Sequence, residues 1–405
     1  MRTTLVISSM RGGGAERVVS HMANYWARTG RPVTILTVAH GSHPPFYRLD
    51  PRVTHRDIRF SRAARQPIPD AHTLTALKDV FDDGTPAERR RLLVELQLVV
   101  ALRRAVIATR PDVVISFINA TNVRTLLAMR ALDVPVIVSE RTDPYHDRLT
   151  EGLQQLRTRM YREAAYLVGP TADIAAFFAP ELGHRVRVIH NPVLQPCVRR
   201  PACATPADAT ASRTLVAMGR LSDEKGFTLL LRAFAIVAGK HPSWSLHIWG
   251  EGPQRPALER LAQKLRLNGR VRLPGFTWHP FDELASADAF ALSSLYEGFP
   301  NALCEAMACG LPAVSFNCSS SIPEIIRNDV DGVIVPALDV SALAAAFDRV
   351  MSSDEYRQRL AARAIEVVGR FSVDNAMARW EQLVVESCTR RFSDGRQDLV
   401  PLRNP

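Results

Sequence analysis

The segment Glu297-Gly-Phe-Pro-Asn-Ala-Leu-Cys-Glu305 places two carboxylates eight positions apart within a predicted strand-to-helix turn. An apolar run, 287–295, precedes it, and a run rich in Ala and Leu follows it and ends at Gly310-Leu-Pro312, a typical helix stop. We therefore expect Glu297 in the loop and Glu305 inside the helix. Strand, loop and helix in this order form the repeating unit of an α/β fold.

The start of this predicted helix suits a phosphate group. Pro300 fits the first helical turn, where its missing N–H removes a donor that would have no partner anyway. The N–H groups of Asn301, Ala302 and Leu303 are then expected to point out of the helix and to attract phosphate. The two glutamates would repel a diphosphate. We expect them to accept hydrogen bonds from hydroxyls instead, one from a ribose and the other from a hexose.

The cations that a diphosphate requires are expected upstream, in Met218-Gly-Arg-Leu-Ser-Asp-Glu-Lys-Gly226. This segment follows the apolar run 214–218, so Arg220 and Lys225 fall in one loop at the carboxyl end of a strand, where open parallel sheets bind ligands. A guanidinium forks across phosphate oxygens, and an ammonium supplies a point charge. Alone, the pair would be interpreted as solvated side chains of a surface loop. Two matched strand-to-helix turns favour a binding site.

Four motifs occur in order along nearly the whole chain, from the first strand to about Trp380: Gly12-Gly-Gly-Ala-Glu-Arg17, Arg220 with Lys225, Gly250-Glu-Gly-Pro253, and Glu297 with Glu305. Each motif is weak alone, but together they resemble the retaining GT-B glycosyltransferases of family 4, or group 1. The resemblance implies a catalytic group of Glu297, Arg220 and Lys225. The donor-binding residues that it implies are Gly13, Gly14, Gly252, Gly298, Phe299, Pro300, Asn301, Ala302, Leu303 and Glu305.

The length of the chain predicts two domains, because 405 residues are more than a single hydrophobic core usually accommodates. Apolar runs alternate with helical patterns, which predicts two doubly wound parallel sheets. A Pro- and Ala-rich stretch, 192–211, reads as the linker. We expect a first domain at 1–196, a nucleotide-sugar domain at 210–370 and a returning tail at 371–405. The predicted strands lie at 3–9, 33–38, 112–117, 134–138, 166–169 and 186–189, and then at 214–218, 244–249, 270–273, 288–293, 312–316 and 332–335.

The predicted helix at 372–389 carries four apolar residues on one face: Met377, Trp380, Leu383 and Val384. In the family that the chain resembles, such a helix crosses back onto the first domain. The resemblance thus implies an active site in a cleft between two Rossmann-like domains.

The loop Gly12-Gly-Gly14 follows the first predicted strand and opens a helix whose Val18, Val19, Met22 and Trp26 are spaced for burial. Glycines allow a backbone to approach a ligand closely. A tight turn without a ligand is one alternative and a dinucleotide site another. Arg17 replaces the third glycine of the dinucleotide pattern, which disfavours the second. The resemblance places Gly13 and Gly14 beneath the donor phosphates or the acceptor.

A further turn, Ser139-Glu-Arg-Thr-Asp-Pro144, follows the run 134–138, where many members of the family place a His. It resembles the subgroup that adds sugars to polyprenyl-diphosphate-linked oligosaccharides, often from UDP-hexosamine or UDP-galactose. Glu140 and Arg141 are therefore acceptor-side candidates. A buried structural ion pair between them is an equal alternative.

The net charge of +10 falls partly on two predicted helices. The helix at 86–109 carries Arg89, Arg90, Arg91, Arg103 and Arg104 around an apolar body of Leu92, Leu93, Leu96, Val99 and Val100, and the helix at 148–164 carries Arg157, Arg159 and Arg162. Basic amphipathic helices can lie on anionic membrane surfaces. The same pattern also fits a helix whose apolar face packs on the protein core and whose basic face is solvated. No recognition module or basic run interleaved with aromatics indicates nucleic acid.

Several absences shape the remaining expectations. The six cysteines form no C-x-x-C pair, the first strand leaves no room for a signal peptide, and no apolar run is long enough to span a membrane. We expect a cytoplasmic protein, with peripheral attachment to the inner face of the cytoplasmic membrane as a hypothesis. Asp329-Val-Asp331 reads as a turn, and we expect no metal and no cofactor beyond the nucleotide-sugar co-substrate.

The resemblance implies a retaining, metal-independent transfer of a hexose or N-acetylhexosamine to a glycan acceptor, with a lipid-linked oligosaccharide as the expected acceptor. UDP is the expected nucleotide and GDP the alternative. A sugar-nucleotide epimerase and a non-catalytic binding partner of the same architecture are the competing functions. The four charged residues and the motif order favour the transferase.

Overall fold

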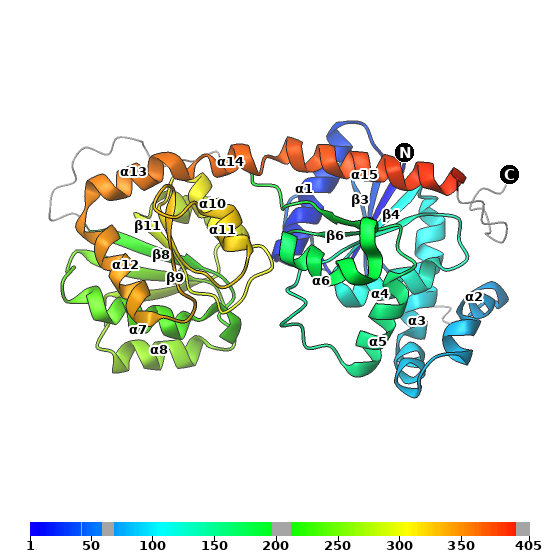
Figure 1. Ribbon diagram of the computed structural model, residues 1–405, viewed down its shortest axis with the longest axis horizontal. Coiled ribbons are helices and arrows are strands. Elements are labelled where there is room, and N and C mark those ends of the chain that lie inside the picture. Colours follow the sequence, from blue (N-terminus) through cyan, green and yellow to red (C-terminus); the bar gives the residue numbers. More distant parts are fainter. Residues whose placement is uncertain (42, 59–68, 197–211, 394–405) are drawn as a thin grey trace. The chain divides into compact units, whose positions relative to one another are not determined.

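The computed structural model describes residues 1–41, 43–58, 69–196 and 212–393. It forms two compact units (Figure 1). Unit 1 comprises Met1–Pro192 and the segment that begins at Asp374, and unit 2 comprises Val193–Val373. The expected boundaries were 196 and 371. Residues 197–211 of the expected linker lie outside the described part of the chain.

Unit 1 is built on a parallel sheet that, in the residues described, contains seven strands in the order β3-β2-β1-β4-β5-β6-β7. The strands are β1 (Thr3–Ile7), β2 (Val33–Thr37), β3 (Thr54–Asp57), β4 (Val113–Phe117), β5 (Val136–Ser139), β6 (Tyr166–Gly169) and β7 (Val186–Val188). The strand order reverses at β1, as in a doubly wound fold. Sequence patterns predicted six of these strands and missed β3, whose residues alternate between exposed and half-buried at the sheet edge.

The helices of unit 1 are α1 (Gly14–Arg28), α2 (Ala71–Asp82), α3 (Pro86–Thr109), α4 (Asn119–Met129), α5 (Glu151–Tyr161), α6 (Ala172–Leu182), the 3-10 turn η3 (Gly183–Arg185) and α15 (Val373–Ser393). Their apolar faces bury one core, in which Leu36, Leu102 and Leu156 are fully buried. The predicted buried face of α1 is confirmed, since Val18, Val19, Met22 and Trp26 are at most 2% exposed. Buried leucines and valines at helical spacing hold these helices on the sheet.

The C-terminal helix α15 packs on unit 1 (Figure 1). The four residues expected on its buried face, Met377, Trp380, Leu383 and Val384, are at most 3% exposed. Glu386 joins α15 to two strands of unit 1. It accepts a hydrogen bond from Tyr166 at 3.2 Å and pairs with Arg187 at 3.8 Å. The predicted return of the tail to the first domain is confirmed.

Unit 2 repeats the architecture with a parallel sheet that shows six strands in the described residues, in the order β10-β9-β8-β11-β12-β13. The strands are β8 (Arg213–Met218), β9 (Trp244–Trp249), β10 (Val271–Gly275), β11 (Ala289–Leu292), β12 (Ala313–Phe316) and β13 (Gly332–Val335). All six had been predicted within a few residues. Together the two sheets confirm the predicted pair of doubly wound, Rossmann-like domains.

Helices cover both faces of the unit 2 sheet: the 3-10 turn η4 (Asp223–Lys225), α7 (Phe227–Ala238), α8 (Arg255–Lys264), α9 (Pro280–Ala285), α10 (Asn301–Ala308), α11 (Ser321–Ile325), α12 (Val340–Ser352), α13 (Asp354–Ala364) and α14 (Val367–Arg370). Residues of β8 point alternately to two cores. Leu215 and Ala217 pack with α7, α8 and α12, whereas Val216 packs with α9, α10 and α11. The loops at the carboxyl ends of the strands are thereby held between two packed layers.

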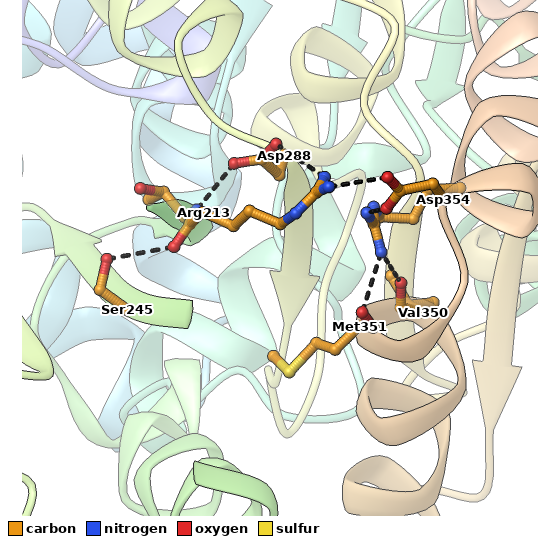
Figure 2. A network of polar contacts seen from close by, with 8 residues as sticks. Arg213, Ser245, Asp288, Val350, Met351 and Asp354 are labelled. Carbon is orange, nitrogen blue, oxygen red and sulfur yellow. Dashed lines mark hydrogen bonds and ion pairs between the residues drawn. The ribbon is translucent and has the colours of Figure 1, made fainter. Parts of the chain in front are cut away.

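The opposite, amino end of this sheet is tied to α13 by a polar network (Figure 2). Arg213, the first residue of β8, donates to Asp354 at 2.7 Å and lies 3.8 Å from Asp288. Asp288 in turn accepts the backbone N–H of Thr214 at 2.8 Å. These bonds fix where β8 begins and therefore where its carboxyl end delivers the next loop.

Candidate functional site

Lys225 and Glu297, predicted from separate motifs, form an ion pair. Lys225 Nζ lies 2.7 Å from Glu297 Oε1, and the two side chains are 24% and 10% exposed. Ser294 Oγ donates to the same carboxylate oxygen at 2.6 Å. The sequence interpretation had missed Ser294. The structure thus brings a cation, a carboxylate and a hydroxyl together at the carboxyl edge of the unit 2 sheet.

Backbone bonds hold the two loops that carry this pair. Leu295 N donates to Glu224 O at 2.8 Å, and Ser293 Oγ donates to Lys225 O at 2.9 Å. Gly226 adopts a φ of +59°, and a Cβ at this position would lie 2.1 Å from Ser293 O. Only glycine therefore allows the loops to approach this closely.

The electrostatics favour a charged Lys225. Burial alone would lower the pKa of the ammonium, but the attraction of Glu297, with a smaller contribution from Glu224, raises that pKa on balance. Burial and the charge of Glu297 also raise the pKa of the nearby Cys318 thiol, to about 12, which favours its uncharged form. At neutral pH the site therefore holds a charged ammonium and an uncharged thiol beside Glu297.

The loop Gly250-Glu-Gly-Pro253 packs against the loop of Arg220. Leu221 N donates to Glu251 O at 2.9 Å, and Gly219 N donates to Trp249 O at 3.0 Å. A Cβ on Gly252 would lie 2.3 Å from Leu221 O. The predicted donor-binding residue Gly252 thus permits close packing of two protein loops.

Arg220 lies in the same loop as Lys225 and is exposed. Within the described part of the chain, its guanidinium has no hydrogen-bond or ion-pair partner, whereas its carbonyl accepts the N–H of Ser222 at 2.9 Å. The side chain is therefore available to a ligand at this edge of the sheet.

The turn into α10 differs in detail from the prediction. Glu297 lies in the loop and Glu305 inside the helix, as expected, and Glu305 is only 6% exposed. Pro300 is the N-cap residue and not part of the first turn. Its carbonyl accepts the N–H of Leu303 at 3.1 Å. The expectation that the N–H of Leu303 points out of the helix is therefore wrong.

Two other residues of this turn serve the core. Phe299 is 7% exposed and packs edge-on against Phe371, with ring centroids 5.8 Å apart, and Leu303 is fully buried. Gly298, Asn301 and Ala302 are partly exposed. The side chain of Leu303 is therefore part of the core, and that of Phe299 is almost entirely so.

In unit 1, two aromatic side chains contact the glycine loop, in which Gly12 and Gly14 are exposed and Gly13 is half-buried. Tyr47 Oη donates to Gly13 O at 3.2 Å, and a Cβ on Gly12 would contact the ring of Phe46 at 3.3 Å. Gly13 has extended backbone geometry and caps α1, which begins at Gly14. A Cβ on Gly13 would lie 2.4 Å from Glu16 Oε2. That oxygen is the end of a flexible side chain, so internal packing alone does not require a glycine at position 13.

The turn of Glu140 and Arg141 holds a buried carboxyl group and a half-buried guanidinium, which have different partners. Tyr161 donates a short hydrogen bond to Glu140, and Arg141 donates a short hydrogen bond to Asn191. The Arg141 guanidinium also lies over the rings of Phe117 and Trp380, at 5.5 and 6.0 Å from their centroids. The structure gives no ion pair of these two residues with each other, so the structural alternative is wrong in that form.

Both groups are electrostatically perturbed. Burial raises the pKa of Glu140 to about 7, against the hydrogen bond from Tyr161. Burial lowers the pKa of Arg141 to about 9, and its Nε and Nη2 atoms have no hydrogen-bond partner in the described residues. Beside them, Ile118 has a φ of +72°, which is strained for a β-branched residue. Perturbed groups and strain together often mark functional sites.

The expected turn at Asp329-Val-Asp331 is structural. Asp331 is fully buried and accepts from Arg327 Nε at 2.7 Å and from Arg370 at 3.3 Å. Asp329 has a φ of +60°. Asp331 is thus already neutralised by two arginines of the chain.

The basic helix α3 has the predicted bounds, but its faces differ from the prediction. Arg103 is 4% exposed and donates to Ala128 O at 2.8 Å and to Arg130 O at 2.7 Å. Leu93, assigned to the apolar body, is 60% exposed, as is its neighbour Val94 at 72%. The exposed face of α3 therefore combines Arg90 with two large apolar residues. No helix in the described residues is long and apolar enough to span a membrane.

Comparisons with known proteins agree with this geometry. The family described as "Glycosyltransferase Family 4" matches residues 12–193, and that described as "Glycosyl transferases group 1" matches residues 206–367. The exopolysaccharide phosphotransferase SCO2592 of Streptomyces coelicolor is 28% identical over 94% of this chain, which spans only 40% of that protein.

Two further proteins match over nearly their full length. An undecaprenol-linked oligosaccharide α-1,4-N-acetyl-D-galactosaminyltransferase of Campylobacter jejuni is 22% identical over 95% of this chain and 99% of its own. The structure of Anabaena HepE in complex with UDP superimposes with a TM-score of 0.72, at 17% identity, over 95% of this chain and 100% of the other. The chain is therefore a glycosyltransferase with the GT-B fold and belongs to family 4, the group 1 glycosyltransferases.

Proposed function

We propose that the chain transfers a hexose or N-acetylhexosamine from a UDP-sugar to a glycan acceptor, with retention of the anomeric configuration and without a metal ion. The product would be a bacterial polysaccharide or glycolipid. The observation that carries this proposal is the contact of Lys225 with Glu297 beside the exposed Arg220, at the carboxyl edge of the unit 2 sheet. HepE, which has the same fold, was crystallised with UDP.

The cations of this edge would stabilise the leaving diphosphate. Lys225 donates one N–H to Glu297, which leaves two donors of the ammonium for phosphate oxygens. The guanidinium of Arg220 can fork across a second phosphate. Preorganised charges at the atom where charge develops lower the barrier to transfer. A divalent ion is then unnecessary.

Glu297 would hold the sugar. Its Oε1 accepts from Lys225 and Ser294, and its Oε2 has no partner in the part of the chain that the structure describes. A sugar hydroxyl can donate to Oε2, while buried Glu305 serves the ribose hydroxyls. In this mechanism the departing phosphate takes the acceptor proton, so the enzyme supplies no nucleophile. The uncharged thiol of Cys318 agrees with that assignment.

A donor panel tests the proposal. Purified protein is incubated with UDP-glucose, UDP-galactose, their N-acetylated forms and GDP-mannose, and the thermal shift and slow hydrolysis are measured for each. We expect stabilisation by UDP-sugars and an α-anomeric product by NMR. An epimerised donor without acceptor would establish the competing epimerase function, and binding without turnover the non-catalytic one.

The role of metal is tested separately, in excess EDTA. Donor hydrolysis should remain at the level of the untreated protein. Loss of activity that manganese restores would overturn the metal-independent mechanism.

We further propose a lipid-linked acceptor and peripheral attachment to the cytoplasmic face of the membrane. The Campylobacter relative acts, by its name, on an undecaprenol-linked oligosaccharide. On α3 of this chain, exposed Arg90 lies one turn from exposed Leu93 and Val94. Apolar side chains flanked by a cation suit the interface of an anionic bilayer.

A liposome experiment tests this surface. The variant Arg90→Glu/Leu93→Glu/Val94→Glu should lose binding to anionic vesicles and keep its UDP thermal shift. Arg89 and Arg91 are left intact, because Arg89 donates to Asp82 O and Arg91 pairs with Glu95. Equal recovery of both proteins on the vesicles would contradict the proposed surface.

A further inference from the structure

One face of the unit 2 sheet is incompletely covered at its edge strands. On β8, Val216 is buried beneath α9 and α10. In the same register, Val216 pairs with His247 of β9, and His247 pairs with Arg272 of β10. His247 is half-buried and Arg272 exposed. The helix above them, α9, has six residues, of which Leu284 is buried.

A cavity of about 540 Å³ lies between these strands and α9. This volume is typical of small-molecule sites. Its wall contains an indole ring from Trp249, the guanidinium of Arg272, the imidazole of His247 and the carboxyl group of Glu283. Thr214 of β8 also lines the cavity. The wall therefore mixes one aromatic surface with several hydrogen-bonding groups.

The cavity extends away from the proposed donor site. Lys225 and Glu297 follow the carboxyl ends of their strands, whereas Thr214 lies near the amino end of β8. Thr214 precedes Met218 by four residues, which corresponds to about 13 Å along a strand. A molecule that reaches Thr214 would occupy space that the donor diphosphate does not need.

The chemistry of the wall selects an uncharged, hydroxyl-rich ligand. The single cation, Arg272, is accompanied by the carboxyl group of Glu283, so the wall has no excess of positive charge for a phosphate. Burial and the charge of Arg272 lower the pKa of His247, which is then neutral and can both donate and accept. A sugar ring matches these groups, because its hydroxyls bond to polar side chains and its C–H face packs on an aromatic ring.

We propose that this cavity binds a short uncharged segment of a glycan, as a carbohydrate site separate from the site of transfer. Pro274 of the wall is followed by exposed Phe276 and Trp278, whose ring centroids lie 5.2 Å apart. These two exposed rings follow the strand that lines the cavity and form an aromatic pair of their own. A glycan held here would stay on the enzyme while its reacting end is released. The proposal goes beyond the proposed function, since it does not depend on which sugar is transferred.

Calorimetric titration of the whole chain with three trisaccharides tests the proposal: neutral maltotriose, N-acetylated chitotriose and acidic trigalacturonate. Ser286→Trp fills the cavity from α9, and Arg272→Ala removes a polar group of its wall. Arg260→Ala is the control, because exposed Arg260 lies on α8, which packs on the other face of the sheet. The UDP thermal shift reports the fold and the donor site of each variant.

Wild type and Arg260→Ala should bind a neutral or N-acetylated trisaccharide. Binding should weaken at least about tenfold in Arg272→Ala and disappear in Ser286→Trp, with the UDP shift unchanged. If Ser286→Trp loses the UDP thermal shift, its fold or donor site is damaged, and the trisaccharide affinity of Arg272→Ala alone then tests the proposal. The proposal is overturned if neither uncharged trisaccharide binds wild type, if only the acidic one does, or if the affinity is the same in Arg272→Ala. If UDP produces no thermal shift in wild type, that result would instead count against the proposed transfer function.

Discussion

At the scale of single residues, the contact of Lys225 with Glu297 has a cost as well as a use. Both side chains are largely buried, so desolvation offsets much of their attraction. The pair is therefore weak evidence for stability. In the proposed mechanism its value is positional, because it would hold the ammonium ready for the diphosphate and the carboxylate ready for the sugar.

The first prediction separates the roles of the two glutamates. Glu297→Gln keeps the shape of the side chain but removes its charge, so transfer should fall by about 10- to 100-fold, the worth of one charge-assisted hydrogen bond. The affinity for UDP, measured by calorimetry, should change much less. Glu305→Gln is the matched variant, and there UDP affinity itself should fall about tenfold. If both variants lose only thermal stability, neither glutamate binds the donor.

The second prediction concerns Glu140, whose pKa burial raises from 4.5 to about 7. Between these values the unfolded chain loses the proton first, so this group lowers stability as pH rises and contributes its full share only below about pH 4.5. The accumulated loss is on the order of 3 kcal/mol. Glu140→Gln cannot ionise. Its melting temperature should therefore gain several degrees on wild type between pH 5 and pH 8. A constant difference would show that Glu140 ionises normally.

Single-residue chemistry was only partly predictable from sequence. The motifs identified Lys225 and Glu297 because their spacing from strands and helices is local information. The partners of Glu140 and Arg141 were not predictable in this way. Tyr161 lies 21 positions from Glu140, and Asn191 lies 50 positions from Arg141. Neither partner belongs to a motif, so only the fold brings them together.

At the scale of elements, glycines set how closely the donor-side loops can pack. Gly250 has a φ of +143°, and a Cβ there would lie 1.8 Å from Gly219 O. The third prediction is that Gly250→Ala lowers the free energy of unfolding of unit 2 by about 3 kcal/mol or more, because the loop must shift and the backbone is strained. UDP binding should weaken with it, since Arg220 follows Gly219 directly.

Gly239→Ala provides the control for that substitution. Gly239 ends α7 with helical geometry, and a Cβ there would meet nothing within 4 Å. This variant should be as stable as wild type or gain up to about 1 kcal/mol. Equal urea midpoints for both variants would mean that the loop packing at Gly250 tolerates a methyl group.

The elements themselves were mostly predictable, and the exceptions have a physical cause. Central strands such as β4 are buried on both faces and read as apolar runs. Edge strand β3 consists of Thr54-His-Arg-Asp57 and has no such run. For α3 the helical spacing of apolar residues predicted the helix correctly. It did not show that Arg103 enters the core, where it donates hydrogen bonds to carbonyls at the end of α4.

At the scale of the whole molecule, each unit has a core of its own. The charged residues proposed to bind the donor, Arg220, Lys225, Glu297 and Glu305, lie in unit 2. The predicted donor-binding glycines Gly13 and Gly14 and the acceptor-side candidates Glu140 and Arg141 lie in unit 1. Donor binding should therefore stabilise one unit more than the other. A substitution of Arg103 should destabilise unit 1 specifically, because this residue is buried and caps α4.

The last prediction uses that division. Calorimetric melting of the full chain should show two transitions, and UDP at about 100 times its Kd should stabilise unit 2 by about 2.7 kcal/mol. For a unit of this size, that raises one transition by about 5 to 10 °C. Arg103→Ala should lower only the other transition, because it leaves two carbonyls of unit 1 without their donor. A UDP shift in the transition that Arg103→Ala lowers would place the nucleotide in unit 1. A single transition that responds to both changes would show that the units unfold together, and the assignment of donor binding to unit 2 would then rest on the Glu305→Gln titration alone.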